Sequence, residues 1–181
     1  MIPLRDADYA GWRLILWLDL ALLVLVRRCE RRALTPLMKA LTHAGDTPSW
    51  LLLTAALAAS GGDGPLQAAL LATGAGLALL VSQALKRVCC RPRPSEAPGD
   101  AVCALADDPD AFSFPSGHTA VAFGVAVALA GQGGALGEVA LALACGIGAS
   151  RVYLGAHYPL DVAAGALLGT GAGWLAQALV A

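Results

Sequence analysis

The 181-residue sequence carries little charge for its length. Only 14% of its residues are Asp, Glu, Lys or Arg, whereas 57% are apolar and the mean hydropathy is +0.66. A typical soluble domain has about 25% charged residues, so this composition favours a lipid bilayer as the surrounding solvent. The 12 basic and 13 acidic residues nearly cancel. Without a basic excess or a long Lys/Arg run, a nucleic-acid-binding function is excluded.

The cysteines lack the paired spacing of a zinc site and are odd in number. The chain has five cysteines without paired metal-ligand spacing: Cys29, Cys89, Cys90, Cys103 and Cys145. We therefore expect neither a metal nor another cofactor. A disulfide from Cys89 or Cys90 to Cys103 stays open, because it depends on whether that loop faces an oxidising compartment. The alternative is a set of small, mostly buried thiols.

Long apolar runs account for most of the chain. A helix needs about 20 predominantly apolar residues to cross the hydrocarbon core. Runs 65–84, 116–137 and 162–181 contain no Asp, Glu, Lys or Arg. Two shorter runs, 48–61 and 135–150, are also predicted to span, because chain continuity between the longer ones requires them. The sequence thus predicts an all-α polytopic transmembrane helical bundle, forming a single domain over residues 1–181.

The first 46 residues are predicted to form helices of a different kind. Arg13 and Asp19 interrupt the apolar run 12–26, which either crosses the membrane or lies on its surface. Five or six spans are therefore expected. Apolar residues then recur at helical spacing on one side of a short amphipathic helix: Leu34, Leu37, Met38 and Leu41. This helix lies at the interface or packs on the bundle, and His43 on it is interpreted as a packing residue without a companion.

The unusual polar residues gather where four spans are predicted to end on one membrane face. In chain order they are Lys86 and Arg93 in the loop 86–113, Ser116, Gly117 and His118 at the start of one span, Arg151 at the end of the next, and His157 and Asp161 at the start of the last. In a chain so poor in charge, this convergence predicts an anion-binding site.

The residue types suit a phosphoryl group. Arg93 and Arg151 offer planar guanidinium forks and Lys86 a point charge for its oxygens. Ser116 and Gly117 lie in a predicted first helical turn, where free N–H groups and the helix dipole favour an anion. These cations and this helix start neutralise a phosphate without a metal, which predicts a preorganised electrostatic site.

Two histidines supply the nucleophile and the acid that such a site needs. Asp161 can accept a hydrogen bond from one ring nitrogen of His157, leaving the other to attack phosphorus. His118 can protonate the leaving oxygen and then activate water. Taken singly, each histidine is more often an interfacial packing residue, and juxtamembrane cations usually bind headgroups.

Asp19 is interpreted as interfacial, with an intramembrane functional role as the alternative. The loop acids are interpreted as solvated: Asp107, Asp108 and Asp110.

The same residues resemble the motifs of the type 2 phosphatidic acid phosphatase (PAP2) superfamily. The three motifs are Lys86, six residues, Arg93-Pro94; Pro115-Ser116-Gly117-His118; and Ser150-Arg151, five residues, His157, three residues, Asp161. The resemblance implies a helical membrane fold, usually of six spans in bacterial lipid phosphatases. It also implies roles: Lys86, Arg93, Ser116, Gly117 and Arg151 bind phosphate, His118 is the acid, His157 the nucleophile and Asp161 its orienter.

These observations predict a metal-independent lipid phosphatase that acts through a phosphohistidine on a lipid phosphate in the bilayer. The substrate is left open between an isoprenoid diphosphate, such as undecaprenyl diphosphate, and a glycerolipid phosphate, such as phosphatidylglycerophosphate or phosphatidic acid. A lipid phosphotransferase and a nonenzymatic membrane scaffold or transporter are the alternatives.

We expect an integral protein of a bacterial inner (plasma) membrane. Its oligomeric state is open, and so is its sidedness, because positive-inside counting and the family resemblance place the site on opposite faces.

Overall fold

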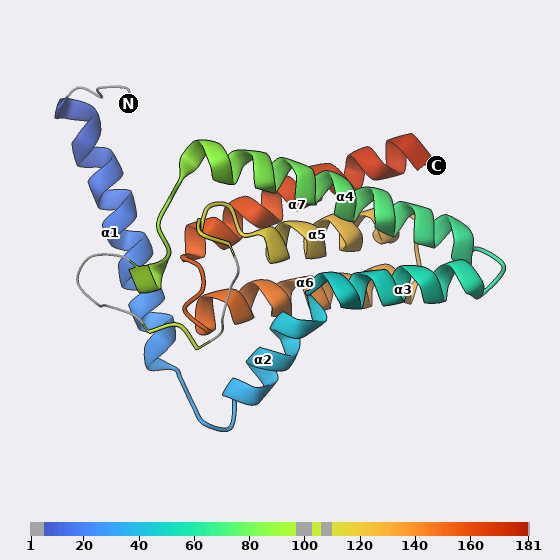
Figure 1. Cartoon of the computed structure of the whole chain (residues 1–181), viewed down its shortest axis with the longest axis horizontal. Coiled ribbons are helices and arrows are strands. Elements are labelled where there is room, and N and C mark those ends of the chain that lie inside the picture. Colours follow the sequence, from blue (N-terminus) through green and yellow to red (C-terminus); the bar gives the residue numbers. More distant parts are fainter. Residues whose placement is uncertain (1–5, 97–102, 106–109, 181) are drawn as a thin grey trace.

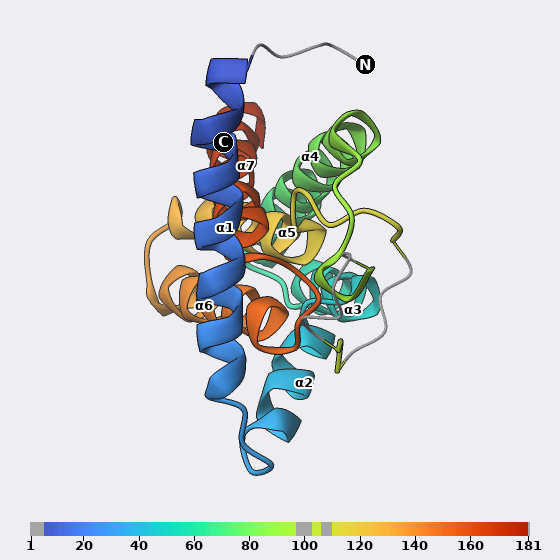
Figure 2. The same cartoon turned by 90° about the vertical axis from the view of Figure 1, so that its left-hand side faces the viewer.

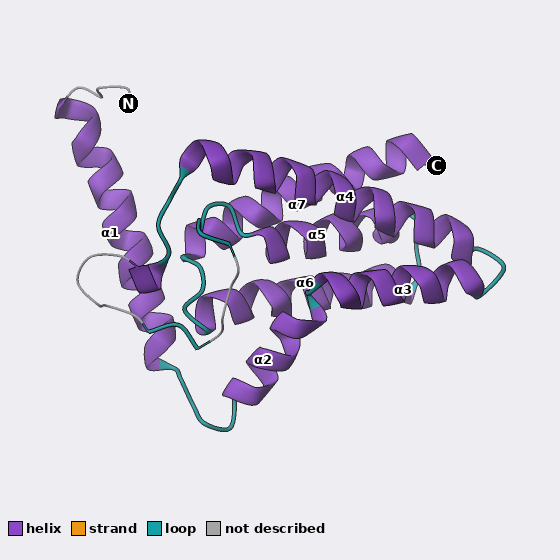
Figure 3. Ribbon diagram, in the orientation of Figure 1, coloured by secondary structure: helices purple, strands orange, loops and turns teal. Residues whose placement is uncertain are grey.

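The computed structural model describes residues 6–96, 103–105 and 110–180 of the chain. These residues form seven α-helices and one 3₁₀ turn, and no strand occurs among them (Figure 3). The elements are α1 (Asp6–Arg28), α2 (Thr35–Ala44), α3 (Thr47–Ala59), α4 (Gly64–Cys89), η1 (Pro94–Glu96), α5 (Gly117–Ala130), α6 (Ala135–Tyr153) and α7 (Pro159–Val180). The all-α prediction is confirmed.

Helices α3 to α7 run side by side along the long axis of the molecule (Figure 1). Helix α1 lies across one end of this bundle, as the turned view shows (Figure 2). By length and composition, α4, α6 and α7 are sufficient to cross a membrane, and α3 and α5 are shorter apolar helices. The chain is therefore an integral membrane protein. The crosswise position of α1 supports the surface alternative for run 12–26.

Helix α5 is shorter than predicted. The apolar run in the sequence extends over 116–137, but the helix ends at Ala130 after 14 residues, a rise of about 21 Å. The reason is the turn that follows it, in which Gly133 and Gly134 have φ of 72° and 82°. Such positive φ values favour glycine and end a helix. The full-length prediction for this span is therefore wrong.

Helix α2 packs on the bundle. Leu41 lies against α6, where a Cβ added to Gly146 would be 3.2 Å from the Leu41 side chain. Leu37 on the same helix remains 54% exposed. Of the two alternatives for this amphipathic helix, contact with the bundle is present in the structure, and its outer face is left for the membrane interface.

Helix α4 ends at two exposed cysteines. It runs to Cys89, so the loop predicted from residue 86 begins only at Cys90, whose φ of 47° terminates the helix. All five cysteines are free and exposed. The structure thus contains no disulfide to Cys103, and the expectation of mostly buried thiols is wrong.

Glycines allow α5 to pack closely against α4 and α7. A Cβ added to Gly74 of α4 would lie 2.7 Å from the carbonyl oxygen of Gly124. One added to Gly169 of α7 would lie 2.2 Å from the carbonyl oxygen of Ala120. Without side chains at these points the backbones approach directly, as in other close membrane-helix contacts. Helix α5 is thereby held at the centre of the bundle, which fixes the position of its N-terminus.

Replacement of Gly169 by alanine should destabilise the protein, and Gly171→Ala on the same helix is the matched control. Both changes raise helix propensity by about 1 kcal/mol, but a Cβ at Gly171 meets nothing within 4 Å. At Gly169 the clash is with backbone, and overpacking costs about 1–3 kcal/mol. Thermal unfolding in detergent should show a lower midpoint for Gly169→Ala and an equal or higher one for Gly171→Ala. A shift in the same direction for both would contradict this packing.

Candidate functional site

Four helix ends meet at the end of the bundle that α1 crosses (Figures 1 and 2). They are the C-terminal ends of α4 and α6 and the N-terminal ends of α5 and α7, the four ends on which the polar patch was predicted from the sequence. Backbone hydrogen bonds tie them together. The Ser116 N–H, at the start of α5, donates to the carbonyl of Asp161 in α7 (3.0 Å), and the His157 N–H donates to the carbonyl of Arg151 (3.2 Å).

His157 and Asp161 lie together at the start of α7. Pro159 opens this helix, so Asp161 falls in its first turn and His157 in the connection before it. Both side chains are buried, and His157 Nδ1 lies 3.6 Å from Asp161 Oδ2, slightly longer than a hydrogen bond. The same carboxylate oxygen accepts the Tyr158 N–H at 2.9 Å. The predicted pair is therefore present, with the carboxylate anchored to the backbone of its own turn.

The environment of His157 favours a neutral ring. Burial lowers the pKa of His157 to about 4, and the nearby cations Arg151 and Arg93 contribute to the decrease, although Asp161 acts to raise this pKa. A group with a pKa of about 4 is unprotonated at neutral pH. The ring can then act as a nucleophile, since only the neutral imidazole has a lone pair to donate.

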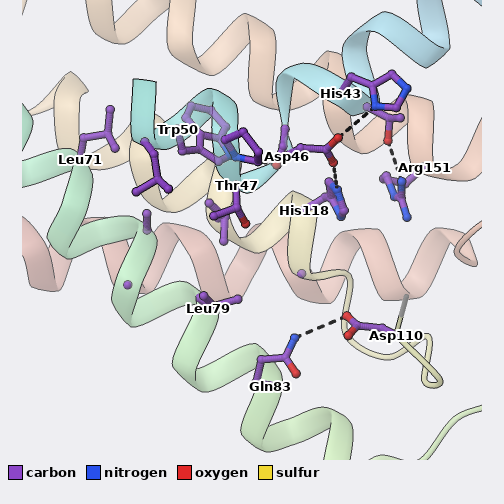
Figure 4. Close-up of a pocket in the computed structure, with 18 of the residues that line it drawn as sticks. His43, Asp46, Thr47, Trp50, Leu71, Leu79, Gln83, Asp110, His118 and Arg151 are labelled. Atoms are coloured by element: carbon purple, nitrogen blue, oxygen red, sulfur yellow. Dashed lines mark hydrogen bonds and ion pairs between the residues drawn. The ribbon is translucent and has the colours of Figure 1, made fainter. Parts of the chain in front are cut away.

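His118 also has a carboxylate partner, which the sequence did not reveal. Its Nε2 lies 2.8 Å from Asp46 Oδ1, and the second oxygen of Asp46 lies 3.0 Å from His43 Nδ1 (Figure 4). Burial alone would raise the pKa of Asp46, but the hydrogen bonds to His43 and His118 bring it below its usual value. His43 was interpreted as a residue without a companion, and this interpretation is wrong.

The contact of Asp46 with His118 could not be predicted, because a helix start already explains an aspartate at this position. Asp46-Thr47-Pro48 is a typical helix start, and Asp46 is indeed the N-cap residue of α3. Its side chain, however, makes no capping hydrogen bond. The carboxylate points to the histidines instead: His43 is three residues before it in the chain, whereas His118 comes close to it only through the tertiary structure.

The three predicted phosphate-binding cations are buried around the same helix ends. Arg93 donates from Nη1 to the carbonyl of Ala156 at 3.0 Å. Arg151 donates from Nη1 to the hydroxyl of Thr42 at 2.7 Å. Lys86 lies beside the start of α5, because a Cβ added to Gly117 would be 4.0 Å from its Nζ. Hydrogen bonds to fixed protein groups therefore hold the guanidinium groups in place.

Asp110 is part of this cationic site. Its carboxylate forms an ion pair with Lys86 and lies 3.4 Å from Gln83 Nε2, while its carbonyl accepts a hydrogen bond from Arg93 Nε at 2.6 Å. Asp110 was interpreted as a solvated loop acid; its side chain is 38% exposed, but it is paired with Lys86 rather than only with water. Asp107 and Asp108 lie outside the described residues.

A cavity of about 990 Å³ leads from this site along the bundle (Figure 4). Three of the eight predicted site residues line it: Gly117, His118 and Arg151. The other five are buried, each with 4% or less of its surface exposed: Lys86, Arg93, Ser116, His157 and Asp161. Away from the polar end the lining becomes apolar: Trp50 and Leu51 from α3, Leu71, Ala75 and Leu79 from α4, and Val121 from α5. The cavity thus joins a charged end to an apolar length.

Asp19 and Arg91 are two further residues whose positions the sequence did not reveal. The preferred interpretation placed Asp19 at the membrane interface, but it is 1% exposed and forms an ion pair with Arg91. Arg91 in turn binds Asp161. The one available signal was the presence of a carboxylate inside an apolar run, which is expensive unless the group is paired.

No group of three or more His, Cys, Asp or Glu side chains within residues 6–96, 103–105 and 110–180 is arranged to hold a metal ion. The ionisable groups there form carboxylate–histidine and carboxylate–cation pairs instead. What the described site can do is bind an anion with its cations and present two imidazoles.

Comparison with curated proteins finds bacterial relatives. The chain is 37% identical over 130 residues to decaprenylphosphoryl-5-phosphoribose phosphatase of Mycolicibacterium smegmatis, covering 70% of this chain and 68% of that protein. It is 49% identical over 57 residues to the bacitracin transport permease protein BcrC of Bacillus licheniformis, covering 32% and 28%. The Mycobacterium tuberculosis phosphatase of the same name is 36% identical over 100 residues, covering 55% and 54%. The chain thus spans only about a quarter to a half of the last two relatives.

Solved structures give the same picture of the fold. LpxE of Aquifex aeolicus superposes with a TM-score of 0.77 at 29% identity, covering 88% of this chain and 94% of that one. The PAP2-type phosphatidylglycerolphosphate phosphatase of Bacillus subtilis superposes with a TM-score of 0.70 at 24% identity, covering 97% and 87%. The family profile described as the PAP2 superfamily matches residues 67–181, which contain all three motifs. The chain therefore belongs to the PAP2 superfamily.

Proposed function

We propose that the protein is a membrane lipid phosphatase that transfers the terminal phosphoryl group of its substrate to His157 and then to water. The observation that carries this proposal is a cavity with an apolar length whose polar end is lined by His118, Asp46 and Arg151. The second imidazole–carboxylate pair, His157 and Asp161, is buried at the same helix ends with Lys86 and Arg93. A phosphoryl group needs the charged end, and a lipid chain needs the apolar length.

In the first step, the lone pair on Nε2 of neutral His157 attacks phosphorus. The bond between phosphorus and the lipid oxygen breaks, and His118 in its protonated form delivers a proton to that oxygen. Asp161 stabilises the positive charge that the phosphorylated ring acquires. The nonbridging oxygens are bound by the cations and by the N–H groups at the start of α5: Lys86, Arg93, Arg151, Ser116 and Gly117.

In the second step, water attacks the phosphohistidine. His118, now neutral, takes a proton from the water, the phosphorus–nitrogen bond breaks, and inorganic phosphate leaves. Asp46 serves both steps, because its carboxylate fixes the orientation of His118 and stabilises the protonated ring. The proton taken from water leaves His118 protonated again, and the cycle closes without a redox change.

Asp110 and the phosphoryl group compete for Lys86, since both are anions that seek the same ammonium group. Substrate entry then exchanges one anion for the other at Lys86. A buried lysine that always has an anionic partner avoids the cost of an unpaired buried charge.

A polyprenyl-linked phosphate is the substrate class that we place first. The apolar part of the cavity supports a long hydrocarbon tail, and the Mycolicibacterium smegmatis relative is named for a decaprenyl-linked phosphate. Glycerolipid phosphates form the second class, since the charged end selects only the phosphate. We further propose a location in a bacterial inner membrane, as the relatives are bacterial.

The direct test is phosphate release from a panel of purified lipid phosphates in detergent, with and without EDTA. Wild-type protein should release phosphate in both conditions, His157→Ala should reduce release to background, and His118→Ala should reduce it by about 10²–10⁴-fold. Turnover that required an added metal would contradict the mechanism. Release of phosphate only after transfer to an added alcohol would indicate a phosphotransferase, and no turnover at all would indicate a scaffold or transporter.

The phosphohistidine can be trapped. With a ³²P-labelled phosphate ester that has an activated leaving group, His118→Ala should accumulate an acid-labile, alkali-stable phosphoprotein. Such a leaving group does not depend on the proton from His118, so the attack of water is slowed more than the transfer to His157. His157→Ala should accumulate none. Label on His118 in the His157→Ala variant would identify the other ring as the nucleophile and reverse the proposed roles of the two histidines.

The protonation state of His157 can be measured without turnover. The chain has three histidines, so imidazole ¹⁵N NMR in detergent can follow each, with His157→Ala identifying the signal. Because burial lowers its pKa to about 4, the ring should stay neutral as the pH falls to about 5 and titrate below that. Asp161→Asn should move the titration to still lower pH, since the carboxylate acts to raise the pKa. Titration near the ordinary value of about 6.5 would contradict the buried setting.

Blocking the apolar cavity should affect lipids selectively. Gly76 of α4 lines the cavity, and a Cβ added there meets nothing within 4 Å. Gly76→Phe should raise KM for a long-chain lipid phosphate by about 10-fold, the effect of about 1.4 kcal/mol of lost binding, while leaving hydrolysis of a short water-soluble phosphate ester unchanged. Leu80→Phe on the outer face of the same helix, 69% exposed, is the control. Equal effects on both substrates would show that the tail lies elsewhere.

A further inference from the structure

We propose that Asp19 of α1, acting through Arg91, is a positioning residue for the nucleophile: it fixes the Asp161 carboxylate and thereby the ring of His157. The inference rests on the proposed function, because it assigns a role to residues beside the proposed nucleophile. It makes helix α1 a part of the reaction machinery, although none of the three family motifs lies on this helix.

The contacts form a continuous chain from α1 to the nucleophile. Asp19 Oδ2 lies 2.6 Å from Arg91 Nη2, and Arg91 Nη1 lies 2.7 Å from Asp161 Oδ1. The other oxygen of Asp161 faces His157 Nδ1. The side chains of Asp19 and Asp161 are fully buried, and that of Arg91 is 16% exposed. Three segments far apart in the sequence thus share one guanidinium group.

Arg91 suits this place because it carries one charge in a rigid plane. Each terminal nitrogen of the guanidinium group binds a different carboxylate, which fixes the distance and the orientation between Asp19 and Asp161. The plane also lies over the Tyr158 ring, with 3.9 Å from Cζ to the ring centroid. Lysine would keep the charge but offer no fork. Two buried carboxylates without this cation would be strongly unfavourable.

Asp19 makes a second contact that reaches the same turn. Its Oδ1 accepts the Leu160 N–H at 2.9 Å, one of the N–H groups that the first turn of a helix leaves without a partner. A carboxylate at this place also suits the positive end of α7. Asp19 therefore holds the backbone of the turn that bears Asp161 with one oxygen and the Asp161 side chain, through Arg91, with the other.

This double attachment accounts for an otherwise costly group. A buried carboxylate in an apolar helix is tolerated only when it is fully paired, and both oxygens of Asp19 have partners in the site. Attachment of α1 to the rest of the protein does not require Asp19. Arg27 on the same helix already donates to the carbonyls of Tyr153 at 2.9 Å and Cys103 at 3.0 Å. Arg27 touches neither Arg91 nor Asp161 in these contacts. A variant of Arg27 therefore tests the attachment of α1 without changing the contacts that position Asp161.

The experiment compares Asp19→Asn with the docking control Arg27→Gln in the full-length protein, using a lipid phosphate that the wild type hydrolyses. Asp19→Asn should lower kcat by about 10- to 100-fold with KM nearly unchanged, because small misplacements of reacting groups have effects of this size. Arg27→Gln should keep kcat within about 2-fold of wild type, even where the thermal midpoint falls. Arg91→Lys, which keeps the charge but loses the two-nitrogen fork, should lower kcat as Asp19→Asn does.

Epistasis provides the readout that a purely structural role would not give. If Asp19 acts only through Asp161, adding Asp19→Asn to an Asp161→Asn protein should change kcat by less than about 2-fold. Full additivity, unchanged kcat in Asp19→Asn and Arg91→Lys, or an equal loss in Arg27→Gln would overturn the inference alone. A wild-type protein without turnover on any lipid phosphate would instead overturn the proposed function, and the inference with it.

Discussion

The burial of charge at one end of an apolar bundle is the constraint on which the rest of the structure depends. Lys86, Arg93 and Arg151 are each at least 96% buried, as are Asp19 and Asp161. In such surroundings an unpaired charge is very costly. The chain meets this constraint with ion pairs and with hydrogen bonds to fixed protein groups, drawn from five helices and the loop between α4 and α5.

The same constraint shapes the chemistry of the site. Burial, with a smaller contribution from Arg151 and Arg93, lowers the pKa of His157 to about 4, so the ring is uncharged at neutral pH. His118 faces Asp46 with 23% of its side chain exposed, whereas His157 faces Asp161 with 1% of its side chain exposed. The two rings thus each have a carboxylate partner but differ in burial, and such a difference separates the pKa values of two titratable groups. In the proposed mechanism, a phosphate that binds there takes the place of the Asp110 carboxylate at Lys86, so that this lysine keeps an anionic partner.

The bundle holds these groups in place by close backbone contact. Helix α5 brings Ser116 and His118 to the site, and its central position depends on glycines in α4 and α7 that leave no room for a side chain. The shortness of α5 is set at its other end, since the turn at Gly133 and Gly134 returns the chain to α6. The cavity lies between α3, α4 and α5, and its apolar part continues from the end at which His118 and Arg151 lie.

Much of this architecture could be predicted from local patterns. Charge-free runs identified α4 and α7, and the convergence of polar residues at four span ends identified the site end, because hydrophobic length and chain alternation set which ends share a face. Helix-start signals correctly placed Pro159 and Asp161 in the first turn of α7. The motif residues were recognisable because a phosphoryl group requires a particular set of cations and imidazoles.

The sequence by itself determined the membrane class, the approximate positions of most helices and the candidate residues, since these follow from composition, periodicity and residue type. Only the tertiary structure decided which groups pair. The attachment of Asp46 to His118, of Asp110 to Lys86, and of Asp19 through Arg91 to Asp161 joins positions up to 142 apart in number, as from Asp19 to Asp161. Such pairs depend on how helices cross and which side chains are left without water, and neither is encoded in the local spacing of residues.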